Sequence, residues 1–217
     1  MKILEPGKLC EKYEEIRQKT DEIKKELTKG KKTPVEKYLD TINNCDNIDK
    51  IYQRNYKSFY KLTPRSVSNE AWLKQYFGII TSEKENHKRV DIEDVCNIIS
   101  VLSKIPSDKE RRTKKNHYSF STKLLHTINQ DYPIYDSKVV KFYFDKNSSQ
   151  MDRDRFKAIY NDIVKEYTRI EKHPKLKKIF DDIFKKIDNS EKISFVKKID
   201  FVIWQYQKII DKKAKQP

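Results

Sequence analysis

Apolar side chains recur along most of the chain at the three- and four-residue spacing of an α-helix. In residues 8–29, for example, Leu9, Tyr13 and Ile16 fall on one side of a predicted helix, together with Ile23 and Leu27. The Asn-Gly and Asp-Gly pairs that make tight hairpin turns are absent, and runs that alternate between apolar and polar residues are rare. The pattern therefore predicts an all-α protein, a compact helical fold of about nine or ten helices.

Helix-breaking and capping residues mark the ends of these predicted helices. Gly30 ends the first helix, Pro34 opens the second, and Pro64 follows the third. The predicted helices cover residues 8–29, 34–42, 49–62, 68–80, 91–105, 121–128, 136–143, 152–171, 175–187 and 192–211. We interpret 1–217 as a single helical unit. The alternative is two lobes, an N-terminal helical lobe over 1–105 and a basic lobe over 106–217 that holds the active site.

The composition is polar but not that of a disordered chain. Hydrophobic residues make up 36% and charged residues 37% of the 217 residues, yet aromatic residues reach 12%, and disordered chains are poor in aromatics. Only three glycines are present. A Walker loop or a dinucleotide-binding fingerprint needs two or three glycines within one short window, so both are excluded.

Positive charge is concentrated in the second half of the chain. The net charge is +15; residues 1–100 carry 20 basic and 17 acidic residues, whereas residues 101–217 carry 28 basic and 16 acidic residues. An excess of +12 in one half favours an anionic partner, most often nucleic acid. The alternative is a lysine-rich surface that only keeps the protein in solution.

Cysteine and histidine patterns predict neither a structural metal site nor a disulfide framework. Cys10, Cys45 and Cys96 are odd in number and widely spaced, and the four histidines form no His-x-x-x-His pair. Cysteines kept as thiols are typical of a reducing, cytoplasmic compartment. The N-terminus lacks the apolar core of a signal peptide, and no apolar run approaches the roughly 20 residues of a membrane span.

One segment, residues 118–140, carries the candidate chemistry. Lys123 falls in the first turn of the helix predicted from Ser121, where the partial positive charge of a helix N-terminus would lower the pKa of an amine. An extended connector, biased toward β geometry because Tyr132 precedes a proline, leads to Asp136 at the start of the next predicted helix. The two helix starts are therefore expected to face one pocket. The plain alternatives are a surface lysine and an aspartate that only caps its helix.

This segment resembles the helix-hairpin-helix DNA glycosylase superfamily, of the endonuclease III and 8-oxoguanine DNA glycosylase type. The match rests on Ser121-Thr-Lys123 and on Pro133-Ile-Tyr-Asp136-Ser-Lys-Val139, about 25 of 217 residues. The resemblance implies that Lys123 is an amine nucleophile and Asp136 the catalytic carboxylate, with no cofactor. It also implies duplex DNA with a flipped base as the partner. The family's Gly-x-Gly hairpin is absent, and the lysine–aspartate spacing is shorter than usual, which indicates a diverged member.

These two residue types suit the chemistry of base excision. The target base must first leave the duplex stack and enter a pocket. A neutral amine attacks the sugar, and a carboxylate stabilises the oxocarbenium-like cation that forms as the base departs.

Basic and aromatic residues near this segment are the candidate DNA contacts. The predicted nucleic-acid-binding residues are Arg111, Arg112, Lys114, Lys115, His117, Ser121 and Lys138, and the predicted base-pocket residues are Tyr118, Tyr135, Phe201 and Trp204. Trp204 lies four residues after Asp200, on the same side of the last predicted helix. The alternatives are a solvated basic loop over 109–115 and core packing for Trp204.

Three functions from different classes follow from these observations. The first is a DNA glycosylase, with or without AP-lyase activity, that excises a damaged or modified base in repair or in anti-phage defence. The second is a non-catalytic, basic, helical nucleic-acid-binding module. The third is a helical interaction protein that binds no nucleic acid. The sequence leaves open the base recognised, the choice between DNA and RNA, and the oligomeric state.

Overall fold

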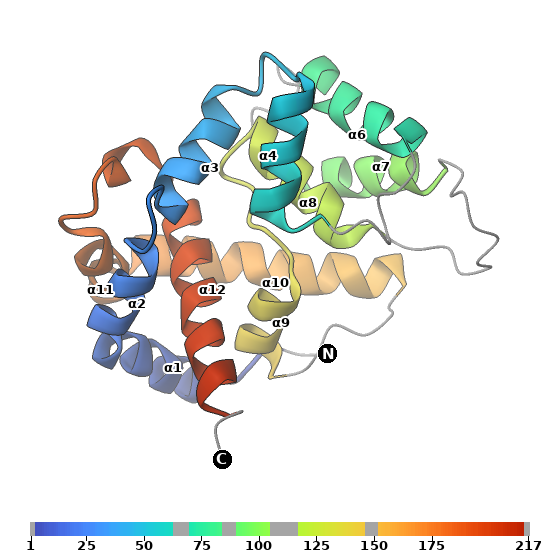
Figure 1. Ribbon diagram of the computed structural model, residues 1–217. Helices are drawn as coiled ribbons and strands as arrows, with labels where there is room; N and C mark the ends of the chain where they lie inside the picture. Colours follow the sequence, from blue (N-terminus) through green and yellow to red (C-terminus); the bar gives the residue numbers. More distant parts are fainter. Residues whose placement is uncertain (1–2, 63–69, 84–89, 105–116, 146–151, 215–217) are drawn as a thin grey trace. The chain divides into compact units, whose positions relative to one another are not determined.

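The computed structural model describes residues 3–62, 70–83, 90–104, 117–145 and 152–214 (Figure 1). These residues contain eleven α-helices and one short 3-10 helix, with no strand among them, and 77% of them are helical. The prediction of an all-α protein is therefore confirmed. Most predicted helix boundaries lie within a few residues of the observed ones, because the apolar spacing marks the buried face of each helix.

The chain divides into two compact units, and each is described by itself. The terminal unit consists of Met1–Glu36 and Pro133–Pro217, and the central unit is Lys37–Tyr132. This division differs from the predicted lobes 1–105 and 106–217. The difference arises because the N-terminal helices bury their apolar side chains against the C-terminal ones, a long-range pairing that helical periodicity does not contain.

The terminal unit is built around the last helix. Helix α12 (Phe195–Lys213) packs against α9, α2 and α11, and α10 packs against α11. Figure 1 shows α12 running beside α9 and α2. The other elements of this unit are α1 (Pro6–Gln18), α2 (Thr20–Leu27), the first turn of α3 (Pro34–Asn43), α9 (Ser137–Phe144), α10 (Arg153–Lys172), α11 (Pro174–Phe184) and the 3-10 helix η1 (Ser190–Lys192).

Polar contacts tie the two halves of the terminal unit together. The Tyr13 hydroxyl donates to Glu166 Oε1 at 2.5 Å, inside the core. The Leu4 backbone amide donates to the carbonyl of Tyr143 at 2.8 Å. Lys208 Nζ pairs with Glu26 at 2.6 Å. The N-terminal helices are thus part of the same core as the C-terminal ones.

The helix predicted over 8–29 is two helices, because the backbone breaks at Lys19. The Lys19 amide shares its hydrogen bond between the carbonyls of Glu15 and Ile16, and its ψ is 15°. The Thr20 hydroxyl donates to the carbonyl of Arg17 at 2.8 Å. Such a side-chain bond to a carbonyl one turn back competes with the helical ladder and bends the chain.

The central unit holds the rest of α3, α4 (Lys50–Tyr60), α6 (Glu70–Glu83), α7 (Ile92–Ser103) and α8 (Tyr118–Ile128). Helix α8 packs against α6 and α7. Tyrosine hydroxyls join α4, α6 and α8 inside this core: Tyr56 lies 3.0 Å from the Tyr76 hydroxyl and 3.1 Å from Thr127 Oγ1. Burial raises the pKa of Tyr56 and Tyr76 well above the usual tyrosine value. These hydroxyls therefore act as neutral structural links.

None of the described helices combines the length and the apolar character needed to cross a bilayer. Cys10 is exposed, whereas Cys45 and Cys96 are buried, and each is a thiol.

Candidate functional site

Lys123 lies in the second turn of α8, not in the first turn as predicted. The helix begins at Tyr118, three residues before the predicted start, and the His117 carbonyl accepts from the amides of Phe120 and Ser121 at 3.0 and 2.8 Å. Trp72 packs against the rings of His117 and Phe120, which anchors the early start. The predicted effect of a helix N-terminus on the Lys123 amine is therefore wrong, because that field is confined to the first turn.

The side chain of Lys123 is half-buried and lies over an aromatic ring. Its Nζ atom is 5.9 Å from the centre of the Phe120 ring. Its backbone carbonyl accepts from Thr127 Oγ1 at 2.9 Å. The lysine is thus on the half-exposed side of α8, whereas Ser121 and Thr122, which precede it, are fully buried.

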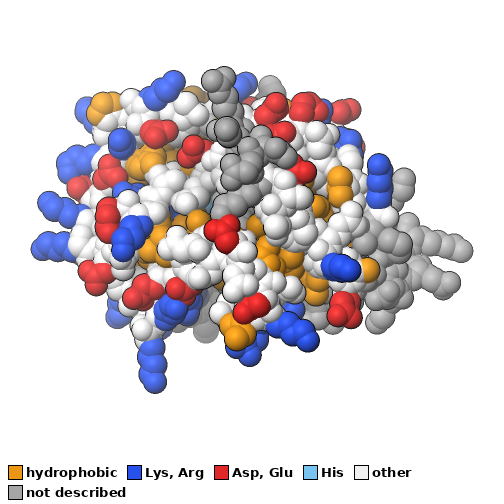
Figure 2. Space-filling model, turned by 90° about the horizontal axis from the view of Figure 1, so that it is seen from above, with side chains coloured by type: hydrophobic (Ala, Val, Ile, Leu, Met, Phe, Trp, Pro, Cys, Tyr) orange, Lys and Arg blue, Asp and Glu red, His pale blue; other side chains and the backbone are white. Residues whose placement is uncertain are grey.

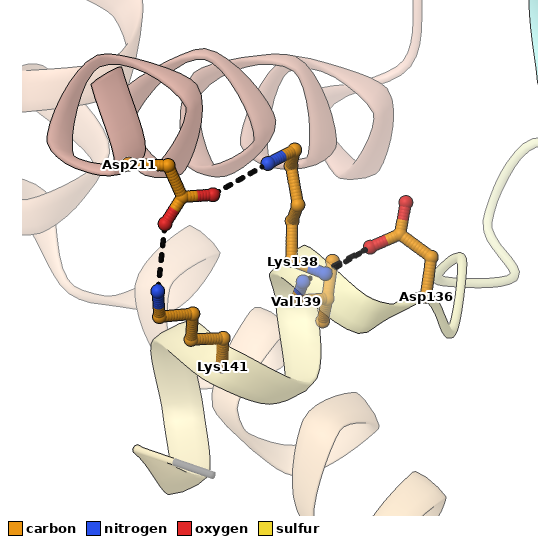
Figure 3. Close-up of polar contacts among 5 residues, drawn as sticks. All are labelled: Asp136, Lys138, Val139, Lys141 and Asp211. Carbon is orange, nitrogen blue, oxygen red and sulfur yellow. Dashed lines mark hydrogen bonds and ion pairs between the residues drawn. The ribbon is translucent and has the colours of Figure 1, made fainter. Parts of the chain in front are cut away.

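The two carboxylate oxygens of Asp136 differ in their contacts (Figure 3). One oxygen, Oδ1, caps α9 by accepting from the backbone amides of Lys138 and Val139 at 2.9 and 3.0 Å. The other oxygen, Oδ2, makes no hydrogen bond or ion pair with the described residues, and it points away from α9 in Figure 3. The predicted helix start and cap are confirmed, and half of the carboxylate remains available to a ligand.

The connector before Asp136 is held firmly within the terminal unit. Its residues Pro133, Ile134 and Tyr135 are buried, and the Tyr160 hydroxyl donates to the Pro133 carbonyl at 2.8 Å. Tyr135, a predicted base-pocket residue, packs edge-on against Phe156 at 5.2 Å. The backbone that presents Asp136 is therefore fixed by side chains of α10.

Lys123 and Asp136 belong to different units, Lys123 to the central unit and Asp136 to the terminal unit. A pocket shared by the two residues stays a prediction.

A second carboxyl group, that of Asp200 on α12, is buried, and the charge of Asp136 acts on it. Its side chain is 5% exposed, and Oδ1 accepts from the Tyr167 hydroxyl at 2.6 Å. Its Oδ2 atom is buried without a hydrogen-bond partner among the described residues. Burial raises the pKa of Asp200 to about 7; the charge of Asp136 adds to this rise, while Lys197, the Tyr167 hydroxyl and the Ile134 backbone amide oppose it. An ionisable group that is buried and perturbed in this way is a candidate functional residue.

Lys197 completes this polar cluster. It is 4% exposed, and its Nζ lies 4.8 Å from the centre of the Phe201 ring. Buried lysines and aspartates are rare unless they compensate each other. Asp200 falls on the same side of the predicted helix as Trp204, and no role is predicted for it, although an aspartate inside the apolar run Ile199–Trp204 is a signal of burial.

Basic side chains of α9 converge on α12 (Figure 3). Asp211 accepts from Lys138 Nζ at 2.9 Å and from Lys141 Nζ at 2.6 Å. Both ammonium groups lower the pKa of Asp211. Lys138, a predicted DNA contact, is therefore already paired within the protein.

Trp204 is half-buried and flanked by two cations. The Nζ atoms of Lys138 and Lys208 each lie 5.7 Å from its ring centre. Favourable cation–π contact holds at this distance. An aromatic ring of α12 therefore lies beside one lysine of α9 and one of α12, which pair with Asp211 and Glu26.

The other residues that were predicted to contact DNA or to line the base pocket lie in different surroundings. Arg111, Arg112, Lys114 and Lys115 lie outside the described residues. His117 stacks on Phe120 at 5.8 Å and is half-buried. Tyr118 and Phe201 are 7% exposed, and Ser121 is 0% exposed, so Ser121 presents no surface to a phosphate. On the face shown in Figure 2, basic and acidic side chains are interspersed.

Within the described parts of the chain, no three His, Cys, Asp or Glu side chains gather as metal ligands would. Comparisons of the chain with protein-family models, curated proteins and solved structures found no match.

Proposed function

We propose that the protein is a DNA glycosylase that uses the carboxylate of Asp136 to excise a damaged or modified base. The observation that carries the proposal is that only one of the two carboxylate oxygens of Asp136 is hydrogen-bonded. Oδ1 is fixed by two backbone amides, which orients the group, and Oδ2 is left available. A carboxylate held in one orientation is what stabilisation of a sugar cation requires.

Affinity for DNA is supported by the net charge of the chain and by one half-buried aromatic ring, that of Trp204. The chain carries a net charge of +15. Trp204 offers a half-buried ring as a stacking surface, and the two lysines beside it, Lys138 and Lys208, pair with Asp211 and Glu26. Aromatic rings bind nucleobases by stacking.

The alternative function is a non-catalytic, basic, helical module that binds nucleic acid. Two observations favour it: Asp136 has a complete structural role as a helix cap, and Lys123 is not at a helix N-terminus. Under this alternative, replacement of either residue changes stability and leaves DNA binding unchanged.

The first experiment compares Asp136→Asn with Asp152→Asn. Asp152 caps α10 by accepting from the Arg155 amide at 2.8 Å, so the two substitutions are matched in residue type and local role. Single-turnover excision is measured on duplex oligonucleotides that carry a panel of modified bases. We expect Asp136→Asn to lower the rate at least about 100-fold, as removal of one transition-state contact does, and Asp152→Asn to leave it unchanged. Equal rates for wild type and Asp136→Asn contradict the proposal.

The amine step is tested separately with borohydride, which traps a Schiff base between the protein and an abasic site. Lys123→Ala is expected to abolish trapping, whereas Lys57→Ala, a change of another half-buried lysine in the central unit, leaves it intact. Trapping that survives Lys123→Ala places the nucleophile on another residue. Excision without any trapping indicates attack by water, which leaves the role of Asp136 in place.

DNA binding itself is tested through its salt dependence. Each phosphate neutralised by a basic side chain contributes about −0.9 to the slope of log K against log salt. Replacement of Arg111, Arg112, Lys114 and Lys115 by Ala is expected to weaken binding and flatten this slope. An unchanged slope shows that residues 109–115 do not contact DNA.

A further inference from the structure

Among the described residues, the excess of positive charge lies in the terminal unit. The described residues of this unit include 28 lysines and arginines against 21 aspartates and glutamates, whereas those of the central unit include 8 against 9. Net charge raises the local concentration of an oppositely charged partner. Within the described parts of the chain, an anion-binding surface is therefore expected on the terminal unit.

Most carboxylates of α2 and α11 are neutralised within the protein. Three of them pair with lysines of α12: Glu22 with Lys213 at 3.1 Å, Glu26 with Lys208 at 2.6 Å, and Asp181 with Lys198 at 3.5 Å. A fourth, Asp182, pairs with Lys178 on α11 itself at 2.5 Å. The remaining carboxylate of these two helices, Asp21, makes no ion pair with the described residues and lies at the start of α2.

Four lysines of the same two helices have no carboxylate partner among the described residues: Lys24 and Lys25 on α2, and Lys175 and Lys185 in the first turn and at the C-cap of α11. Lys24 is half-exposed and the other three are exposed. Lys175 and Lys185 fall on the face of α11 that is turned away from the buried Phe180. Helix α2 packs against α11, and the two lie side by side in Figure 1. We call these four residues the α2–α11 lysine surface.

The α2–α11 lysine surface carries charge without an exposed apolar anchor. Helices that bind a membrane surface insert large apolar side chains, and the centre of a protein–protein interface is apolar and aromatic. Among the described residues, the large apolar side chain that is exposed is Ile51, and it belongs to the central unit. A phosphate backbone, by contrast, is bound by electrostatic attraction that needs no apolar contact. The composition of the surface therefore favours nucleic acid over a membrane or an acidic protein.

We propose that the α2–α11 lysine surface binds the phosphate backbone of a nucleic acid, as a contact separate from Asp136. Lysine ammonium groups bind phosphates as point charges. Lys175 and Lys185 are ten residues apart, about 15 Å along the helix axis, and duplex DNA carries one charge per roughly 1.7 Å, so the surface faces several phosphates. In Figure 1 it lies on the other side of α12 from α9, the helix that Asp136 caps. The proposal goes beyond the proposed function, because it requires a phosphate backbone and no base excision.

The experiment measures binding of a lesion-free DNA duplex by fluorescence anisotropy over a series of salt concentrations. The test variant combines Lys24→Gln, Lys25→Gln, Lys175→Gln and Lys185→Gln. The control combines Lys37→Gln, Lys50→Gln, Lys74→Gln and Lys104→Gln, which are exposed lysines of the central unit without an ion pair to the described residues. The two variants therefore lose the same net charge and differ in where they lose it.

We expect the test variant to flatten the slope of log K against log salt by about 0.9 for each lysine that contacts a phosphate, and the control to keep the wild-type slope. A second measurement needs no substitution: acetylation of wild-type lysines, read by mass spectrometry, is expected to slow at the α2–α11 lysine surface when DNA is bound and to continue at the four control lysines. Protection of both sets alike, or of neither, overturns the proposal.

The other outcomes separate this surface from different explanations. A slope that stays at the wild-type value in the test variant, or that flattens equally in both variants, overturns a localised contact. Binding to phosphatidylserine vesicles that the test variant loses, while its DNA binding is retained, overturns nucleic acid as the partner in favour of a membrane. Localised DNA binding by a protein that excises no base supports this surface and contradicts the proposed function, whereas excision without a localised slope change overturns this surface alone.

Discussion

Asp136 and Asp152 perform the same local task and differ in what surrounds them. Both cap a helix with one carboxylate oxygen in extended backbone geometry, a role that contributes about 1 kcal/mol. Asp152 is exposed, whereas Asp136 is half-buried and its charge raises the pKa of Asp200. At the scale of the residue, it is therefore the second carboxyl group that distinguishes a candidate site from an ordinary cap.

Asp200 has a predictable effect on stability. Its pKa in the folded protein is about 7, above the value of 3.8 that applies to an unperturbed aspartate. The folded state therefore binds more protons than the unfolded state between these values, and the free energy of unfolding falls as the pH rises from about 4 to about 7. The loss amounts to at most a few kcal/mol, since one pKa unit corresponds to about 1.4 kcal/mol.

Asp200→Asn removes this titration, so its stability relative to wild type is expected to increase between pH 5 and 8. Urea unfolding at a series of pH values measures the difference. Parallel curves for the two proteins across this range would show that Asp200 titrates alike in the folded and unfolded states.

At the scale of the element, α9 is held to α12 by one carboxylate and two ammonium groups. Asp211 bridges Lys138 and Lys141, and these lysines come one turn apart on α9. The side chain of Asp211 is 29% exposed, so solvent screens the pairs only in part. Ion pairs of this kind contribute about 1 kcal/mol or less each.

Asp211→Asn is expected to lower the free energy of unfolding at pH 7 by about 1 kcal/mol. Because the lysines lower the pKa of Asp211, the contribution is present above its unfolded value and is lost as the pH falls through its folded one. Asp182→Asn, which breaks the exposed pair with Lys178 on α11, is the control and is expected to change stability less. Chemical denaturation at pH 7 and pH 3 separates the two variants, and equal losses for both would contradict the bridging role of Asp211.

At the scale of the whole molecule, the terminal unit is assembled from the two ends of the chain. Tyr13, Ile16, Ile23 and Leu27 from the N-terminal helices are at most 1% exposed. Each buried side chain of this size contributes roughly 1.5–3 kcal/mol. Together they approach the entire stability of an ordinary domain, about 5–15 kcal/mol.

A fragment of residues 133–217 is therefore expected to lack cooperative thermal unfolding, and addition of a peptide of residues 1–36 should restore it. Circular dichroism of the fragment, alone and with the peptide, measures the effect. A peptide that carries Ile16→Asp is the control, because a charge at a fully buried position prevents docking. Cooperative unfolding of the fragment alone would show that residues 133–217 form a unit without the N-terminal helices.

The amino-acid sequence by itself determined the helical class, most helix boundaries and the cap at Asp136. These features are local: apolar spacing, prolines and capping residues act within one or two turns. The predicted position of Lys123 in the first turn of its helix was nevertheless wrong. The early start of α8 depends on packing of Trp72 against His117 and Phe120, which lie far from Trp72 in the sequence. The tertiary structure alone decided which helices share a core, that Asp200 is buried beside Tyr167, and that Asp211 bridges Lys138 and Lys141. Each of these joins residues more than 30 positions apart, and their pairing is set by which apolar faces bury each other, a choice that no local pattern contains.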